Sequence, residues 1–416
     1  MKRTVVTFIL CALLMLTAAS CGNKKAAKTV TLRFSNAESG TDQIRMMRDI
    51  VAAFEKENPD IKIKLEWGTT QQAILTNIAG KNAPDVFLWW GGFHDLIQKN
   101  VLLDLAPYVK KHGIKTSDYW PALVSYYTYG GSLYALPLQL KTNCILYNKD
   151  MFTAEGIETP SDDWTWNDYY RIAKKLTADT DGNGVRDRFG TITPGFMGWI
   201  YLNGGKFVDP VTKKAVIDSP ETRQALLFLL KLNREVSPSR AEFESMGKGT
   251  FGTVEAFING RVSMIYAPAW MLQGMKYAKF NWDVLPLPIP PSGKRVQTFD
   301  DVGMVVSSTT RHPEAAFRFV SFYCGAKSQR ISAKGRNGIP SNMEIAKKVF
   351  AASPPEHMDY YLQAAEEATI PVALKVSGWT EIVDTLYRNM DLLFNGQRNM
   401  DETLSVIDKE VNRILQ

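Results

Sequence analysis

The sequence predicts an α/β protein made of two lobes. Strand and helix patterns alternate over residues 30–89, which is typical of a parallel sheet covered by helices. Extended segments replace that pattern after residue 134, which indicates that a second body begins there. About 390 residues follow the N-terminal leader, more than a single hydrophobic core usually serves, so we expect two domains.

The N-terminus has the pattern of a secretory signal. Two basic residues precede an apolar run at residues 5–16, which is too short to span a bilayer, and small residues at 18–20 precede Cys21. This resembles the lipobox of bacterial lipoproteins, except that Ala18 stands where leucine is usual. We predict a signal peptide at 1–20, lipidation of Cys21 and a tether at 21–28. The alternative is an ordinary cleaved signal with a chance cysteine.

The first elements of the mature chain follow in order. Apolar residues alternate at 30–34, recur at helical spacing over 44–54 and alternate again at 61–65, which predicts strand, helix and strand. A helix over 71–80 then leads to an apolar run at 85–89, a predicted buried strand. Ligands of open α/β sheets bind beyond the carboxyl ends of the strands, so the loops 35–40 and 89–93 are the first candidates for a site.

The second half is predicted in the same way. Extended segments at 134–148 precede helices near 164–176 and 220–233. Strands are expected at 262–266, 282–288 and 302–306, and several helices from 313 to the end. The chain has no internal repeat, which argues against a structural or adhesive lipoprotein.

Charge and cysteine content narrow the class of protein. The formal net charge of +6 is spread over 416 residues without a dense basic block, so we do not expect nucleic acid as a partner. Beyond the leader, Cys144 and Cys324 each lie in an apolar stretch. One disulfide and two separate buried thiols both remain open.

Five segments carry a family resemblance. They are AFEKENPDIKIKLEW, APDVFLWW, GSLYALPLQLKTNCILYNKDMFTAEGIETP, FINGRVSMIYAPAWM and EAAFRFVSFYCGAKSQRISAKGRNGIPSN. In this order and behind a lipobox, they make the chain similar to the family 1 extracellular solute-binding proteins of ABC transporters, the group that includes maltose-binding protein. The resemblance is specific to the family and leaves the solute open among a sugar, a polyol, an oligosaccharide and a phosphorylated relative.

The resemblance implies a two-lobe periplasmic-binding-protein-like fold (type II). Lobe 1 would comprise 29–140 plus 304–348 and lobe 2 would comprise 141–303 plus 349–416, with crossings near 140–144, 299–302 and 350. The implied function is capture of a carbohydrate in the cleft, hinge closure, and delivery to the permease subunits of an ABC transporter. We expect a monomer held on the outer side of a membrane by its lipid, with no required cofactor.

The candidate ligand-binding residues are rings and hydrogen-bonding groups, as a sugar requires. The aromatic candidates are Trp89, Trp90, Trp199, Tyr266 and Trp270. The resemblance implies an aromatic platform at the position of Trp89, which is therefore preferred, whereas Trp90 and Trp199 could instead be core residues. The polar candidates are Asn36, Glu38, Lys141, Asn143, Asp300, Asp301 and Arg336. Asn36 and Glu38 could instead cap a helix. The alternative for Lys141, Asn143, Asp300 and Asp301 is a purely structural position at the hinge.

An acidic turn is a candidate calcium site. Asp179, Asp181, Asn183 and Asp187 place oxygen donors as in the opening of a calcium loop, with glycine at the sixth position. The twelfth position is Gly190 instead of the bidentate glutamate. A structural Ca²⁺ and a tight polar turn are therefore both open.

A secreted carbohydrate-active hydrolase is the alternative function, because the adjacent acids 162–163 or 300–301 could serve one. Adjacent acids usually point in different directions, however. The sequence also lacks the HExxH, G-x-S-x-G and Walker A patterns, so we predict a binding protein and not an enzyme.

Overall fold

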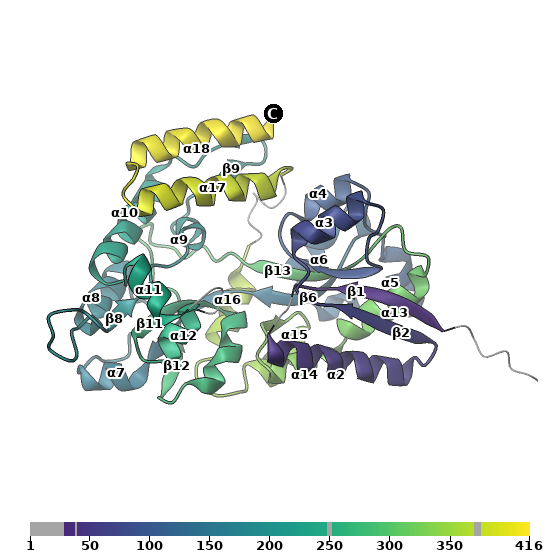
Figure 1. The fold of residues 1–416 in the computed structure, drawn as a ribbon, viewed down its shortest axis with the longest axis horizontal. Helices are drawn as coiled ribbons and strands as arrows, with labels where there is room; N and C mark the ends of the chain where they lie inside the picture. The colour runs from purple at the N-terminus through teal and green to yellow at the C-terminus, as the bar shows by residue number, and fades with distance from the viewer. Residues whose placement is uncertain (1–28, 38–39, 248–251, 370–375) are drawn as a thin grey trace, which may run out of the picture.

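The computed structural model describes residues 29–37, 40–247, 252–369 and 376–416. It confirms the predicted two-lobe α/β fold, with a separate sheet and its own helices in each lobe (Figure 1). The leader, Cys21 and the tether lie outside the described residues.

The first lobe is built on a six-stranded sheet in the order β14-β6-β13-β3-β1-β2. Strand β1 (Val30–Ser35) pairs in parallel with β2 (Ile61–Glu66) and β3 (Val86–Trp89). β13 (Asp300–Val306) runs antiparallel to β3 and β6 (Leu136–Lys141). The short strand β14 (Ile339–Pro340) completes the edge beside β6.

The predicted strand–helix–strand opening is confirmed. Helix α2 (Thr41–Glu57) lies between β1 and β2 and buries Met47, Ile50 and Phe54 at helical spacing. Phe54 also packs edge to face on Phe319 of α13 (Pro313–Tyr323), with ring centroids 5.1 Å apart. A helix from late in the chain therefore covers the same sheet as the first helix.

The second lobe has a four-stranded sheet in the order β12-β7-β11-β8. β7 (Asn143–Asn148) runs antiparallel to β11 (Val262–Pro268) and β12 (Trp282–Leu285), and β8 (Phe189–Thr191) runs parallel to β11. The helices that precede and follow β8 and form part of this lobe are α7 (Lys149–Ala154), α8 (Trp166–Leu176), α9 (Phe196–Leu202) and α10 (Pro220–Glu235).

The chain passes between the sheets with almost no linker. β6 ends at Lys141 and β7 begins at Asn143, so Thr142 alone separates a strand of one sheet from a strand of the other. Thr142 is buried, and its hydroxyl donates to the carbonyl of Tyr361 at 2.9 Å. The boundary predicted between 303 and 304 falls inside β13, all of which belongs to the first sheet. The other lobe boundaries stay predictions.

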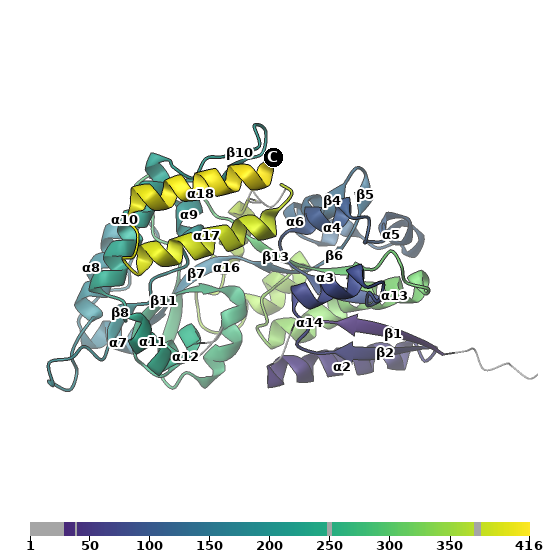
Figure 2. The same ribbon diagram turned by 45° about the horizontal axis from the view of Figure 1, so that its top comes forward.

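The last two helices form a hairpin over the second lobe, as Figures 1 and 2 show. α17 (Trp379–Phe394) and α18 (Met400–Leu415) pack on each other, and the side chain of Asn412 accepts from the backbone N–H of Ala215 at 2.9 Å. At the start of α17, the backbone N–H of Gly378 donates to Asp95 of the first lobe at 3.1 Å. The hairpin therefore rests on one lobe and reaches the other.

The remaining elements are mostly short helices, many of them too short for the sequence periodicity to reveal. They are α3 (Gln71–Ala79), α4 (Phe93–Gln98), α5 (Ala106–His112), η2 (Thr116–Asp118), α6 (Pro121–Tyr127), β4 (Thr128–Tyr129), β5 (Ser132–Leu133), β9 (Val208–Asp209), β10 (Lys214–Ala215), α11 (Arg240–Met246), α12 (Gly252–Ile258), η4 (Ala269–Tyr277), α14 (Ala326–Lys334), α15 (Met343–Ile345), η5 (Ala346–Phe350) and α16 (Tyr360–Glu367).

The two cysteines of the body are free thiols. Cys144 lies in β7 of the second lobe and Cys324 follows α13 of the first, and both are fully buried. Burial raises the pKa of both thiols well above the ordinary value. Within the described ranges, no helix combines the length and the apolar character that crossing a membrane requires.

Candidate ligand-binding cleft

A cavity of about 530 Å³ lies between the lobes. The first lobe contributes the turn that follows β3 and the end of β6, and the second lobe contributes α9, β11 and the start of β7. One face of α17 forms the remaining wall. Residues from opposite sides of the crossing at Thr142 therefore meet in one space.

Five aromatic side chains line this cavity: Trp90, Tyr201, Tyr266, Trp379 and Tyr387. Trp90 follows β3 and precedes two glycines with φ of 59° and 48°, a left-handed turn that favours glycine. The side chain of Gln71 donates to the Trp90 carbonyl at 2.7 Å and fixes the turn from α3. Rings from both lobes and from α17 thus supply apolar faces to one site.

Tyr266 reaches the cavity because of a glycine on the neighbouring helix. A Cβ atom at Gly198 of α9 would clash with the Tyr266 hydroxyl, so only glycine lets this ring lie against the helix. Burial raises the pKa of Tyr266 and of Tyr201, and both phenols stay protonated at neutral pH. The Tyr201 hydroxyl is buried and has no hydrogen-bond partner among the described residues.

Lys141, Asn143 and Asp300 bring the predicted polar groups into the same cavity. Asp300 of β13 is the cross-strand partner of Lys141 of β6, so opposite charges meet on neighbouring strands. Asp300 is open to the cavity, but the surrounding protein atoms replace part of the hydration of its carboxylate, and this desolvation raises its pKa. The positive charge of Lys141 lowers the pKa and offsets only part of the shift. The group can accept hydrogen bonds from ligand hydroxyls when it is ionised.

The sequence predicts Asp301 as a ligand-binding residue, but in the structure this residue does not line the cavity. Its side chain is 1% exposed and points into the first lobe, where it accepts from the Tyr127 hydroxyl at 2.6 Å. It also accepts from the backbone N–H of Gly91 at 3.3 Å, in the turn after Trp90. Burial raises the pKa of Asp301 to about 6. Adjacent residues of a strand face opposite sides, so only Asp300 faces the ligand space.

Trp89 and Trp199, two of the predicted aromatic ligand-binding residues, do not line the cavity either. Trp89 is 4% exposed and packs edge to face on Phe87 inside the first lobe, so strand alternation assigns the cavity to Trp90 instead. Trp199 is fully buried in the core of the second lobe, 4.9 Å from the ring of Trp166. Tyr201, two residues further along α9, lies on the opposite side of the helix and lines the cavity instead.

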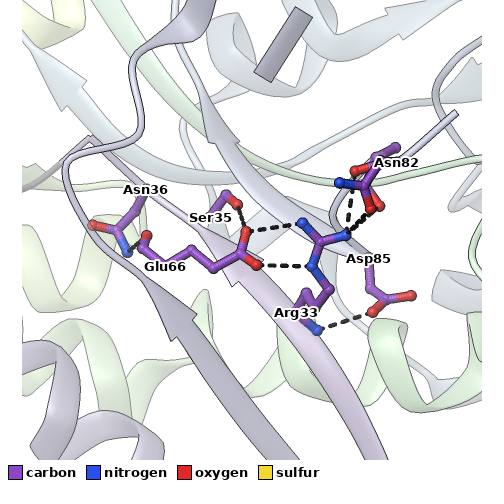
Figure 3. Close-up of polar contacts among 7 residues, drawn as sticks. Arg33, Ser35, Asn36, Glu66, Asn82 and Asp85 are labelled. Carbon is purple, nitrogen blue, oxygen red and sulfur yellow. Dashed lines mark hydrogen bonds and ion pairs between the residues drawn. The ribbon is translucent and has the colours of Figure 1, made fainter. Parts of the chain in front are cut away.

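The loop after β1 contributes structure instead of cavity wall. Asn36 is fully buried, and its amide donates to the Glu66 carbonyl at 3.1 Å, beside the ion pair of Glu66 with Arg33 (Figure 3). The predicted ligand role of Asn36 is therefore not supported by its position. Glu38 lies outside the described residues. Trp270 is half-buried at the start of η4 and does not line the cavity between the lobes.

The last predicted residues lie elsewhere. Arg336 lines a different cavity, described below. In the acidic turn, Asp179 accepts backbone N–H bonds from Gly182 at 2.8 Å and Gly184 at 2.6 Å, while Asp187 accepts from Thr180. These contacts describe a tight polar turn, and Ca²⁺ binding there stays a prediction.

Sequence reasoning missed the contribution of α17. Trp379, Asp384 and Tyr387 lie on the cavity side of this helix. Helical periodicity alone identifies an amphipathic helix and does not distinguish core rings from ligand rings. The one local signal is Gly378, whose φ of 74° ends the preceding turn directly before Trp379.

Comparisons with known proteins agree with this architecture. The family model described as bacterial extracellular solute-binding protein matches residues 38–330. An ABC substrate-binding protein from Listeria monocytogenes, solved in complex with cycloalternan, is 26% identical with a TM-score of 0.83, covering 92% of this chain and 98% of that one. A solute-binding protein from Thermotoga lettingae, solved with alpha-D-tagatose, is 20% identical with a TM-score of 0.79, covering 93% and 100%, and shows the same fold.

Two curated proteins extend the comparison. A Streptomyces antibioticus protein described as an uncharacterized lipoprotein is 23% identical over 373 residues, covering 83% of this chain and 78% of that protein. The sn-glycerol-3-phosphate-binding periplasmic protein UgpB of Escherichia coli is 27% identical over 304 residues, covering 68% of this chain and 66% of UgpB. The match to the family model spans well over half of the sequence. The chain therefore belongs to the family of bacterial extracellular solute-binding proteins.

Proposed function

We propose that the protein captures a carbohydrate in the cavity between its lobes and presents it to an ABC transporter. The observation that carries this proposal is the set of five rings that share one space with Lys141, Asn143 and Asp300. Rings stack on the apolar C–H faces of a sugar, and the polar groups exchange hydrogen bonds with its hydroxyls. The Listeria relative, solved with the sugar cycloalternan, supports the same ligand class.

Hinge closure is the proposed mechanism. Ligand would bind one lobe first, and contacts to the other lobe would then favour the closed form. Two contacts between the lobes are candidates for closed-state clasps. Asp42 of α2 pairs with Lys276 and accepts from Tyr277 of η4, and Gly378 donates to Asp95.

Membrane attachment and delivery complete the proposal. Lipidation of Cys21 would hold the protein at the outer face of a membrane, and the lipoprotein relative from Streptomyces antibioticus supports this inference. The permease subunits of an ABC transporter would then read the closed form. We also propose that the protein acts as a monomer.

A thermal-shift screen of the full chain over a carbohydrate panel tests the ligand class, because a ligand that binds the folded state raises its stability. Hits should then bind in calorimetry and compact the protein in solution X-ray scattering. A panel with no stabilising carbohydrate, or identical scattering profiles with and without a tight ligand, would overturn the proposal. Recovery of each hit unchanged after incubation separates binding from hydrolysis.

A further inference from the structure

A second cavity of about 530 Å³ shares no lining residue with the cleft cavity in the part of the chain that the structure describes. Its walls come from the first half of α2, from η4, from α14 and from the turn that follows α14. α2 and α14 cover the first lobe, whereas η4 directly follows β11 of the second. This cavity, like the first, therefore lies where the two lobes meet.

Arg336 supplies a half-buried positive charge to the wall of this second cavity. Its backbone φ of 54° is unusual for a residue with a side chain. Its guanidinium donates to the carbonyl of Pro354 and lies 5.9 Å from the ring centroid of Trp282. Within the described residues it forms no ion pair with a carboxylate, and burial lowers its pKa. A partly buried cation without a counter-ion is unfavourable, so an entering anion would be stabilised there.

The charge balance of the second cavity favours the same class of ligand. Four basic residues face two acidic ones, namely Arg45, Lys276, Lys334 and Arg336 against Asp42 and Asp49. Asp42 already has two cationic neighbours, because it pairs with Lys276 and lies 3.7 Å from Arg45. Lys334 forms no ion pair with any described residue. The local excess of positive charge is thus concentrated near the turn after α14.

An unused hydrogen-bond donor belongs to another lining residue of the second cavity, Gln273. The side-chain Nε2 of Gln273 in η4 is buried and has no hydrogen-bond partner among the described residues. A buried donor without an acceptor is costly, and an oxygen atom of a bound anion would satisfy it. Donors from both lobes would then converge on one ligand.

We propose that the second cavity binds a phosphate or carboxylate group, with the Arg336 guanidinium as the main donor and Lys334 and Gln273 as supporting donors. Charge-assisted bonds from a guanidinium to such an anion are strong and directional. The site goes beyond the proposed function, which requires only a neutral sugar in the cleft. Its anion is either free in the medium or a substituent carried by the transported solute.

The test compares the full-length wild type with Arg336→Gln, Lys334→Gln and the control Arg330→Gln. Arg330 is exposed on α14, the helix that also carries Lys334, and does not line the second cavity. The free-anion arm titrates sodium phosphate against sodium chloride at equal ionic strength and follows the melting temperature. The substituent arm compares glucose 6-phosphate with glucose and galacturonate with galactose by calorimetry. Circular dichroism confirms that each variant is folded.

We expect saturable binding of an anion that Arg336→Gln weakens about tenfold or more, Lys334→Gln weakens severalfold, and Arg330→Gln leaves unchanged. Binding of phosphate alone identifies a free anion, whereas binding of only the charged sugars identifies a substituent. Anion binding that is absent, or that is equally strong in all four proteins, would overturn the proposal. If Arg336→Gln does not fold, Lys334→Gln decides. Binding of neutral sugars in the same proteins reports separately on the cleft.

Discussion

Replacing each of the two adjacent tryptophans with alanine should produce opposite results. Trp90 lines the cleft cavity and is half-buried, so Trp90→Ala removes a ring face that a sugar would cover. We expect ligand binding to weaken by about 1–3 kcal/mol, or roughly 5- to 150-fold in Kd. The free energy of unfolding should fall by about 1 kcal/mol, less than for a fully buried ring, because Trp90 is only half-buried.

Trp89→Ala is the matched control. Trp89 is 4% exposed and lies between β1 and β13 in the sheet, so its removal leaves a cavity in the core of the first lobe. Such a truncation costs about 3–5 kcal/mol of stability. Urea denaturation measures the stability of each variant, and calorimetry with the best carbohydrate of the panel measures affinity where both are folded. Loss of affinity in Trp89→Ala together with normal binding in Trp90→Ala would refute the assignment of the two rings.

Three further predictions follow from the contacts of single groups. Asp42→Asn removes the ion pair with Lys276 that would clasp the closed form, so it should weaken sugar binding, by less than about fivefold. Salt at 1 M should reduce the difference in affinity between this variant and wild type. An equal difference at high salt would argue against an ionic clasp. The pKa of Asp301 rises from 3.8 to about 6 on folding, so the folded state holds more protons than the unfolded state. The free energy of unfolding therefore falls as pH rises from about 4 to about 6. Asp301→Asn should flatten that slope in urea denaturation, and an unchanged slope would contradict this reasoning. Cys144 and Cys324 should be alkylated only after unfolding, as peptide mass mapping can detect, and labelling of the native protein would contradict their burial.

Much of the fold was accessible from periodicity. The alternation at residues 30–34 and 61–65 and the helical spacing between them correspond to β1, β2 and α2, because one face of each element must be buried against the same core. These signals were strong because long or deeply buried elements constrain the sequence at every second or fourth residue. The crossing near 140–144, where β6 and β7 meet at Thr142, was implied by the family resemblance and not by periodicity.

The cleft was only partly accessible. Lys141, Asn143, Tyr266 and Asp300 line it as expected, because strand ends at a crossing between two sheets can hardly avoid the space between them. Which of two neighbouring tryptophans faces that space depends on the register of β3 against β1 and β13. A sequence that is apolar on both faces of a strand does not encode that register. The contribution of α17 depends in turn on how a late hairpin docks on the second lobe.

The distribution of the rings among the lobes explains why ligand binding should move them. A ligand that touched only one lobe would have equal affinity for the open and closed forms, so it could not shift the equilibrium between them. Here Trp90 belongs to the first lobe and Tyr266 to the second. Trp379 lies on α17, whose last residue, Phe394, accepts a hydrogen bond from Asn233 of the second lobe, while Gly378 at its N-terminus contacts the first lobe. A sugar that stacks on rings of both groups therefore gains contacts only when the lobes approach. Those added contacts are the differential affinity that closure requires, and they place the coupling between binding and motion in the cleft itself.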